Sequence, residues 1–201
     1  MKQQILVIHG GNTFKTHEEY LDYLTYKKKV SLDKLRRNGW KDRLQGTLGD
    51  NYDVLLPHMP NSENARYEEW KIWLEKIAPL LNEEVILIGH SLGGITLVKY
   101  LSENNFPKKV KAVFLIAPAY ASIAGDFDMV DFTLSSDLKK LSDQVRKIFL
   151  YHSKDDEVVP FSNFESFKNE LPEAVFRTFE DRGHFNQAEF PEIIEDIKSL
   201  I

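Results

Sequence analysis

A serine lies between two glycines in the segment Gly-His-Ser-Leu-Gly at residues 89–93, directly after the apolar run at residues 85–88. The run has the composition of a strand buried on both faces, and residues 95–101 are typical of a helix. Gly-x-Ser-x-Gly between a strand and a helix predicts a nucleophile elbow, a sharp turn that exposes the Ser91 hydroxyl. The free N–H groups at the start of the helix would favour negative charge there. The alternative is a glycine-rich turn whose serine has no chemical role.

A serine hydroxyl attacks a carbonyl group only when a base removes its proton and a carboxylate orients that base. In the chain order that accompanies a nucleophile elbow, the acid follows the serine and the histidine follows the acid. Of the 6 histidines, only His152 and His184 come after Ser91, and only His184 also follows a carboxylate at the end of a predicted strand. We therefore predict that His184 is the base. The alternative is a histidine on a surface loop.

The predicted acid is one of two neighbours, Asp155 or Asp156. The residues alone leave both open, because either carboxylate could reach an imidazole from the same loop. The other of the two is then part of a solvated turn before the next helix. A more distant alternative is the acidic group that follows the preceding strand: Asp126, Asp128 and Asp131.

The negative charge that develops on the attacked carbonyl oxygen requires preorganised N–H donors, an oxyanion hole. The backbone amide of Leu92, directly after the serine, is the first predicted donor. The second is expected at the glycine-rich end of the first strand, where Gly11 is favoured and Asn12 is the alternative. His9 and His90 adjoin these positions, and we expect them to fix the backbone rather than to take part in the chemistry.

Apolar runs alternate with helical patterns along the whole chain. This alternation predicts one three-layer α/β domain over residues 1–201, with a mostly parallel sheet of about six strands and helices on both faces. One helix is expected at residues 65–81, with Trp70 and Trp73 in its buried apolar stripe. Sites in such sheets form where strands end, so the loops after the strands that carry the candidate residues should converge. The predicted strands are residues 5–8, 53–57, 85–88, 110–117, 147–151 and 175–179.

The composition narrows the class of protein. The 201 residues carry a net charge of -5 and include no cysteine, which excludes a disulfide, a thiolate metal site and a cysteine nucleophile. Neither the charge nor the length of the apolar runs favours a nucleic acid or a membrane as partner. The N-terminal segment is too short, and has too few apolar residues, to be a signal peptide. A cytoplasmic protein is therefore expected. We expect no metal and no organic cofactor.

Five segments occur in a fixed order: Ile-Leu-Val-Ile-His-Gly-Gly, Tyr-Asp-Val-Leu-Leu-Pro-His-Met-Pro, Gly-His-Ser-Leu-Gly-Gly, Ser-Lys-Asp-Asp-Glu-Val-Val-Pro and Arg-Gly-His-Phe. Through these five segments the chain resembles the small α/β-hydrolases of the retinoblastoma-binding protein 9 and YdeN type. The resemblance covers residues 4–11 and about 38–200. The resemblance implies a serine hydrolase. The family's Asp-x-Val-Val-Pro pattern selects Asp156, which gives an implied triad of Ser91, Asp156 and His184.

We expect hydrolysis of small carboxylic esters through an acyl-enzyme. An amidase or a peptidase could use the same triad, and a protein-interaction module with a vestigial site is the alternative from another class. Residues 13–37 depart from the family pattern, because about 25 residues intervene where a connection of about 2–6 is usual. They begin with a capping box at Thr16 and Glu19. This insert is either a small helical lid over the acyl pocket or a helical flank remote from Ser91.

Overall fold

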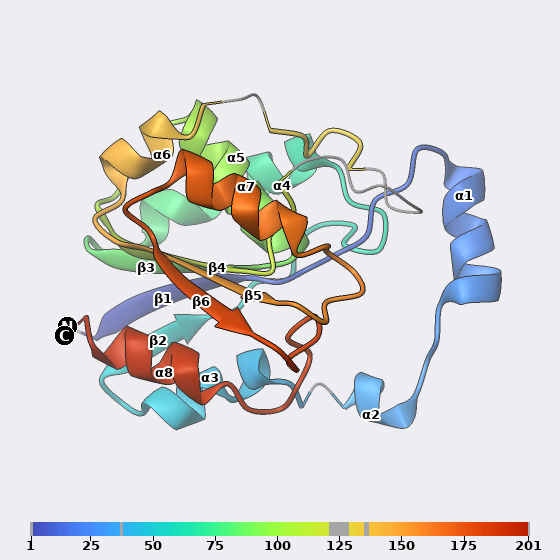
Figure 1. The fold of residues 1–201 in the computed structure, drawn as a ribbon, viewed down its shortest axis with the longest axis horizontal. Helices are drawn as coiled ribbons and strands as arrows, with labels where there is room; N and C mark the ends of the chain where they lie inside the picture. Colours follow the sequence, from blue (N-terminus) through green and yellow to red (C-terminus); the bar gives the residue numbers. More distant parts are fainter. Residues whose placement is uncertain (1, 37, 121–128, 135–136, 201) are drawn as a thin grey trace.

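The computed structural model describes residues 2–36, 38–120, 129–134 and 137–200. Its centre is a six-stranded sheet in the order β2-β1-β3-β4-β5-β6, and every neighbouring pair is parallel (Figure 1). The predicted α/β fold with a parallel sheet is thereby confirmed. The strands are β1 (Gln3–Ile8), β2 (Tyr52–Leu55), β3 (Val85–His90), β4 (Val110–Ile116), β5 (Ile148–Ser153) and β6 (Val175–Phe179).

Helices cover both faces of this sheet (Figure 1). One face carries α4 (Tyr67–Ile77), α5 (Leu92–Glu103), α6 (Lys139–Gln144) and α7 (Ser162–Glu170), and a 3-10 turn, η2 (Ala78–Leu80), extends α4. The other face carries α3 (Trp40–Leu48) and α8 (Pro191–Lys198). Within the described ranges, no helix has both the length and the apolar composition that a membrane crossing requires.

Alternate residues of each strand enter two separate hydrophobic clusters, one on each face. In β3, Leu87 packs toward the face of α4 and α5, whereas Ile86 and Ile88 pack toward α3 and α8. All six residues of β3 are buried. This is why the run at residues 85–88 is apolar without alternation, as expected for a strand covered on both sides.

The predicted helix at residues 65–81 is largely confirmed, with one correction. Trp70 is fully buried, but the side chain of Trp73 is 40% exposed, so the expectation that both tryptophans pack on the sheet was wrong. Three residues turn a helix through about 300°, which places Trp73 at the edge of the stripe rather than within it. The buried residues of α4 are Tyr67, Trp70 and Leu74.

The insert at residues 13–37 folds into short helices beside the sheet (Figure 1). They are α1 (His17–Asp22), a π-helical turn η1 (Tyr23–Lys27) and α2 (Leu32–Leu35). The predicted capping box is present, because Thr16 Oγ1 accepts from the Glu19 amide and the Glu19 carboxylate accepts from the Thr16 amide. Neither α1 nor η1 contains a buried residue, so both lie on the surface of the molecule.

The carboxyl ends of β1 and β3 lie side by side, with Ile8 paired to Gly89. After β1 the chain forms β2 on one side of β1, and it then crosses over to form β3 on the other side of β1. The sheet therefore has its topological switch point between these two strands, where α/β folds form ligand sites. Ser91 and the glycines that follow β1 are at this point.

Candidate active site

Ser91 occupies the predicted turn between β3 and α5. Its φ of 53° and ψ of -119° lie in a region that non-glycine residues rarely adopt. The turn is held by the Ser91 amide, which donates to Ile116 O at 2.8 Å, and by the Gly94 amide, which donates to Ser91 O at 2.9 Å. Strain of this kind persists only where the surrounding structure holds it, and it often marks functional sites.

The turn needs glycine where helix and strand approach each other. A Cβ atom on Gly93 would lie 2.2 Å from Ile8 O, and one on Gly89 would lie 2.5 Å from Gly93 O. Both obstacles are backbone atoms, which cannot move aside as a flexible side chain could.

We therefore expect Gly93→Ala to lower the free energy of unfolding by about 3 kcal/mol or more, at the upper end of the range for overpacking. Urea denaturation followed by circular dichroism measures this change. Gly46→Ala is the matched control, because nothing lies within 4 Å of a Cβ atom there. It should be neutral or stabilising by about 0.5–1 kcal/mol, since Gly46 lies inside α3. Equal stability of the two variants would contradict this account of the turn.

His184 and Asp156 are in direct contact. His184 Nδ1 lies 2.8 Å from Asp156 Oδ2 and 3.1 Å from Oδ1. Because a carboxylate only accepts, the proton of the neutral imidazole is on Nδ1 and Nε2 carries the free lone pair. The His184 side chain is 10% exposed, and the Asp156 side chain is fully buried.

The loop after β5 also distinguishes the two aspartates. Asp156 Oδ1 accepts from the amides of Val158 at 2.8 Å and Val159 at 2.9 Å, which fixes the carboxylate against His184. Asp155 Oδ1 instead accepts from the Ser153 hydroxyl and from the Gly183 amide. These bonds hold the pKa of the Asp155 carboxyl below its usual value. Asp155 thus ties the two loops together and does not contact the imidazole in the manner of Asp156.

The other candidates make different contacts. Asp131 accepts from the Tyr67 amide at the start of α4, and Asp126 and Asp128 lie outside the described residues. His152 is fully buried; its Nε2–H donates to Val159 O at 2.9 Å, and the same nitrogen lies 3.9 Å from Asp156 Oδ2. Within the described ranges, no group of three or more His, Cys, Asp or Glu side chains could hold a metal ion.

The loop after β1 lies next to the serine. A Cβ atom on Gly10 would lie 3.2 Å from Ser91 Cβ, and one on Gly11 would lie 3.2 Å from Leu92 Cδ2. The Asn12 amide donates to Ser62 O at 2.9 Å, so this N–H is already engaged. That leaves Gly11 as the better placed of the two candidates for the second oxyanion donor. The Leu92 amide is in the first turn of α5, where N–H groups have no partner within the helix.

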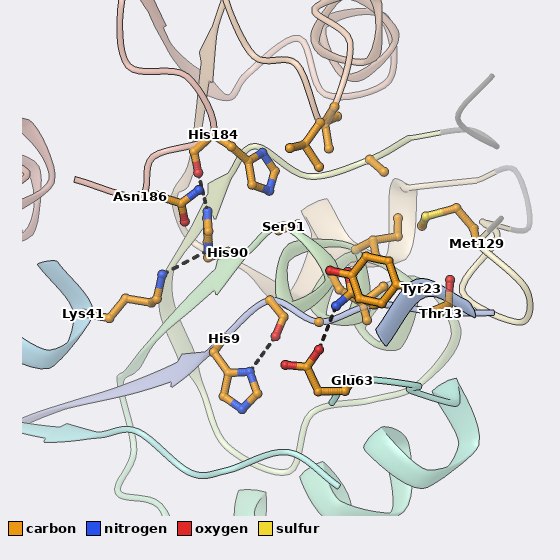
Figure 2. A pocket seen from close by; sticks show the side chains of 18 of the residues that line it. His9, Thr13, Tyr23, Lys41, Glu63, His90, Ser91, Met129, His184 and Asn186 are labelled. Atoms are coloured by element: carbon orange, nitrogen blue, oxygen red, sulfur yellow. Dashed lines mark hydrogen bonds between the residues drawn. The ribbon is translucent and has the colours of Figure 1, made fainter. Parts of the chain in front are cut away.

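A cavity of about 530 Å³ opens above Ser91. Ser91, Leu92, Gly11 and His184 all line it, and Figure 2 shows Ser91, His184 and Tyr23 around the same space. Tyr23 belongs to the insert, and so does Lys28, whose ammonium forms an ion pair with Glu63 at 2.7 Å on the cavity wall. Residues of the insert thus line the same cavity as Ser91.

Two lining residues were not predicted as parts of the site. Lys41 Nζ lies 3.1 Å from His90 Nδ1, and His90 Nε2 lies 2.8 Å from the backbone oxygen of His184. Burial lowers the pKa of Lys41 to about 8, against the opposing effect of the Asp42 carboxylate. The pKa of His90 is well below its ordinary value, mainly because the ring is buried and secondly because of the charge of Lys41. His90 was expected only to fix the backbone, and no sequence pattern connects it to Lys41.

A parallel sheet with a strained serine after the third strand and a His–Asp pair on two later loops defines an α/β-hydrolase fold. The profile of the family described as serine hydrolase matches residues 32–198, so the chain belongs to that family.

Related proteins agree with this result. YdeN of Bacillus subtilis is 27% identical over 94% of this chain and 89% of its own length. The serine hydrolase RBBP9 of Rattus norvegicus is 29% identical over 75% of this chain and 78% of its own. The crystal structure of the B. subtilis ydeN gene product superimposes with a TM-score of 0.76 at 23% identity, and covers 99% of this chain and 98% of that one. The protein is thus a serine hydrolase of the RBBP9 and YdeN family.

Proposed function

We propose that this serine hydrolase cleaves small carboxylic esters with Ser91 as nucleophile, His184 as base and Asp156 as orienting acid. The observation that carries the proposal is the 2.8 Å contact of the buried Asp156 with His184, which lines the same cavity as Ser91. That contact leaves the lone pair of Nε2 available for the serine proton.

In the first half of the reaction, Ser91 Oγ attacks the carbonyl carbon while its proton passes to His184 Nε2. The oxygen that becomes negative accepts hydrogen bonds from the amides of Leu92 and Gly11. His184 then donates the proton to the departing alkoxide, and an ester of Ser91 remains. In the second half, water gives its proton to the same nitrogen and attacks the acyl carbon. His184 then returns that proton to Ser91 Oγ as the bond from Oγ to the acyl carbon breaks, which releases the acid.

The cavity supports a small substrate. Its volume of about 530 Å³ is at the lower end of ordinary ligand pockets. Apolar side chains such as Ile95, Ala119 and Met129 line it together with polar ones, which suits a short acyl chain beside a polar carbonyl. An amide substrate would use the same groups. The intact His184–Asp156 contact makes a protein-interaction module with a vestigial site the weaker interpretation.

A panel of p-nitrophenyl esters from acetate to octanoate tests this proposal. Purified protein should release p-nitrophenolate, with highest kcat/KM for the shorter acyl chains. An initial burst of about one equivalent per chain would report acyl-enzyme formation if deacylation is the slower half. Absence of turnover over the whole panel, in protein that is folded by circular dichroism, would refute the ester proposal.

We also propose that the insert, residues 13–37, forms a wall of the acyl pocket. Tyr23 lines the cavity and packs at a tilt of 40° against the buried ring of Phe14, with 5.1 Å between the ring centroids. Tyr23→Ala should therefore raise KM for the preferred ester about tenfold, as expected for about 1.4 kcal/mol of lost contact. Tyr26→Ala is the matched control from the same insert, because the Tyr26 side chain is 82% exposed. Unchanged kinetics in both variants would rule the wall out.

A further inference from the structure

The imidazole of His90 contacts the backbone of the loop that carries His184. Its Nε2 is 2.8 Å from His184 O, and a carbonyl oxygen only accepts, so the proton of His90 is on Nε2. Nδ1 then carries the lone pair, which accepts from Lys41 Nζ at 3.1 Å. Both partners select the same tautomer. Figure 2 shows both hydrogen bonds, from Lys41 to His90 and from His90 to the backbone oxygen of His184.

His90 is neutral in this arrangement. Only 4% of the residue is exposed, and the ammonium of Lys41 faces its Nδ1, so a second proton on the ring would meet both burial and a like charge. The pKa of His90 is accordingly far below its ordinary value. A neutral ring with a fixed tautomer can act as a rigid spacer between α3 and the His184 loop.

The first turn of α3 holds the same loop at two further points. Trp40 Nε1 donates to Phe185 O at 2.9 Å, and the Trp40 amide donates to Gln187 O at 3.2 Å. Phe185 is fully buried with a φ of 51°, a strained conformation for a residue with a Cβ atom. The backbone next to His184 is therefore held in place by groups that contact neither Ser91 nor Asp156 through a hydrogen bond.

We propose that Trp40, Lys41 and His90 form a clamp that fixes the backbone of the His184 loop and so aims the imidazole at Ser91. This inference rests on the proposed roles of Ser91 and His184. The three side chains are positioning residues: Trp40 and His90 donate to backbone oxygens of the loop, and Lys41 acts through His90. The His90 ring also packs on the His184 ring, with 5.0 Å between the ring centroids. A misplacement of about 1 Å in a catalytic group can cost about 10²-fold in rate, which sets the scale of the effect.

Two substitutions open the clamp at different points. Lys41→Met keeps the length of the side chain and removes the donor, and His90→Phe keeps a ring and removes both nitrogens. Each should lower kcat for a p-nitrophenyl ester about 10–100-fold with KM changed less than about twofold. The double variant should be no worse than His90→Phe, because both changes interrupt the same path. Lys71→Met is the matched control, since Lys71 on α4 forms surface ion pairs with Glu68 and Glu75.

Proton NMR gives a readout that does not depend on turnover. The His184 Nδ1 proton, held by Asp156, should give a downfield resonance in the wild-type protein. That signal should shift or broaden in His90→Phe and Lys41→Met, and it should not change in Lys71→Met. If the wild-type protein hydrolyses no ester, the proposed function fails and this signal still tests the clamp. Wild-type kcat and an unchanged signal in folded Lys41→Met would overturn the clamp, including the case in which His90→Phe does not fold.

Discussion

Asp156→Asn is expected to lower kcat about 10⁴-fold with little change in KM, as loss of an orienting carboxylate does in other serine hydrolases. The reason is the tautomer of His184. Asp156 Oδ1 already accepts from the amides of Val158 and Val159, so the amide oxygen of asparagine would take that position. Its NH₂ group would then face His184 Nδ1 and donate to it. The imidazole would carry its proton on Nε2, where it cannot accept the proton of Ser91.

Asp155→Asn is the matched control for this experiment. Asp155 accepts from Ser153 and Gly183 through the single atom Oδ1, and the amide oxygen of asparagine can take over both bonds. We expect kcat within about threefold of the wild-type value, in line with the small effect of most neutral surface substitutions. Steady-state kinetics on one p-nitrophenyl ester measures both variants. A severe loss in Asp155→Asn beside a mild one in Asp156→Asn would reverse the assignment of the acid.

Ser91→Ala should reduce turnover about 10⁶-fold, to the low rate that binding and the oxyanion donors alone can sustain. Only Oγ is removed, and the backbone bonds of the turn, from Ser91 N to Ile116 O and from Gly94 N to Ser91 O, remain. The variant should fold with a melting temperature close to that of the wild type. Ser166→Ala is the control and should keep full activity, because the hydroxyl of the half-buried Ser166 on α7 donates to Ser162 O within the same helix. Residual turnover above about 1% of wild type in Ser91→Ala would show that another group attacks the substrate.

The elbow could be predicted because all its determinants are adjacent in the chain. The buried strand, the two glycines and the helix after Ser91 fall within about twenty residues, and each is dictated by local sterics or by burial. The choice of His184 needed only the order of residues along the chain. The parallel sheet followed from the alternation of strand and helix patterns, which the structure confirms.

The two aspartates show where sequence reasoning stops. Asp155 and Asp156 share a loop, a charge and a distance from the strand, so no pattern separates them without the family resemblance. What distinguishes them is the direction of each carboxylate, which depends on Val158, Val159 and Gly183. Gly183 is 28 residues away in the chain from Asp155, so this contact depends on how β5 and β6 pair.

The contacts of Lys41 could not be predicted from the sequence either, because they also join residues that are far apart in the chain. Lys41 and His90 are 49 residues apart, and His90 and His184 are 94 apart. Only the packing of α3 below the sheet brings them together. On the sequence, Lys41 is an ordinary lysine near the start of a helix. Its burial beside a histidine is the signal that a structure can supply.

Covalent labelling with a fluorophosphonate, read by intact mass and peptide mapping, tests most directly whether Ser91 is an activated nucleophile. One phosphonyl group should add to each wild-type chain, on the peptide that contains Ser91, and none should add to Ser91→Ala. Labelling of Asp156→Asn should be far slower than that of the wild type. A folded wild-type protein that stays unlabelled, or a label on another residue that persists in Ser91→Ala, would contradict the assignment.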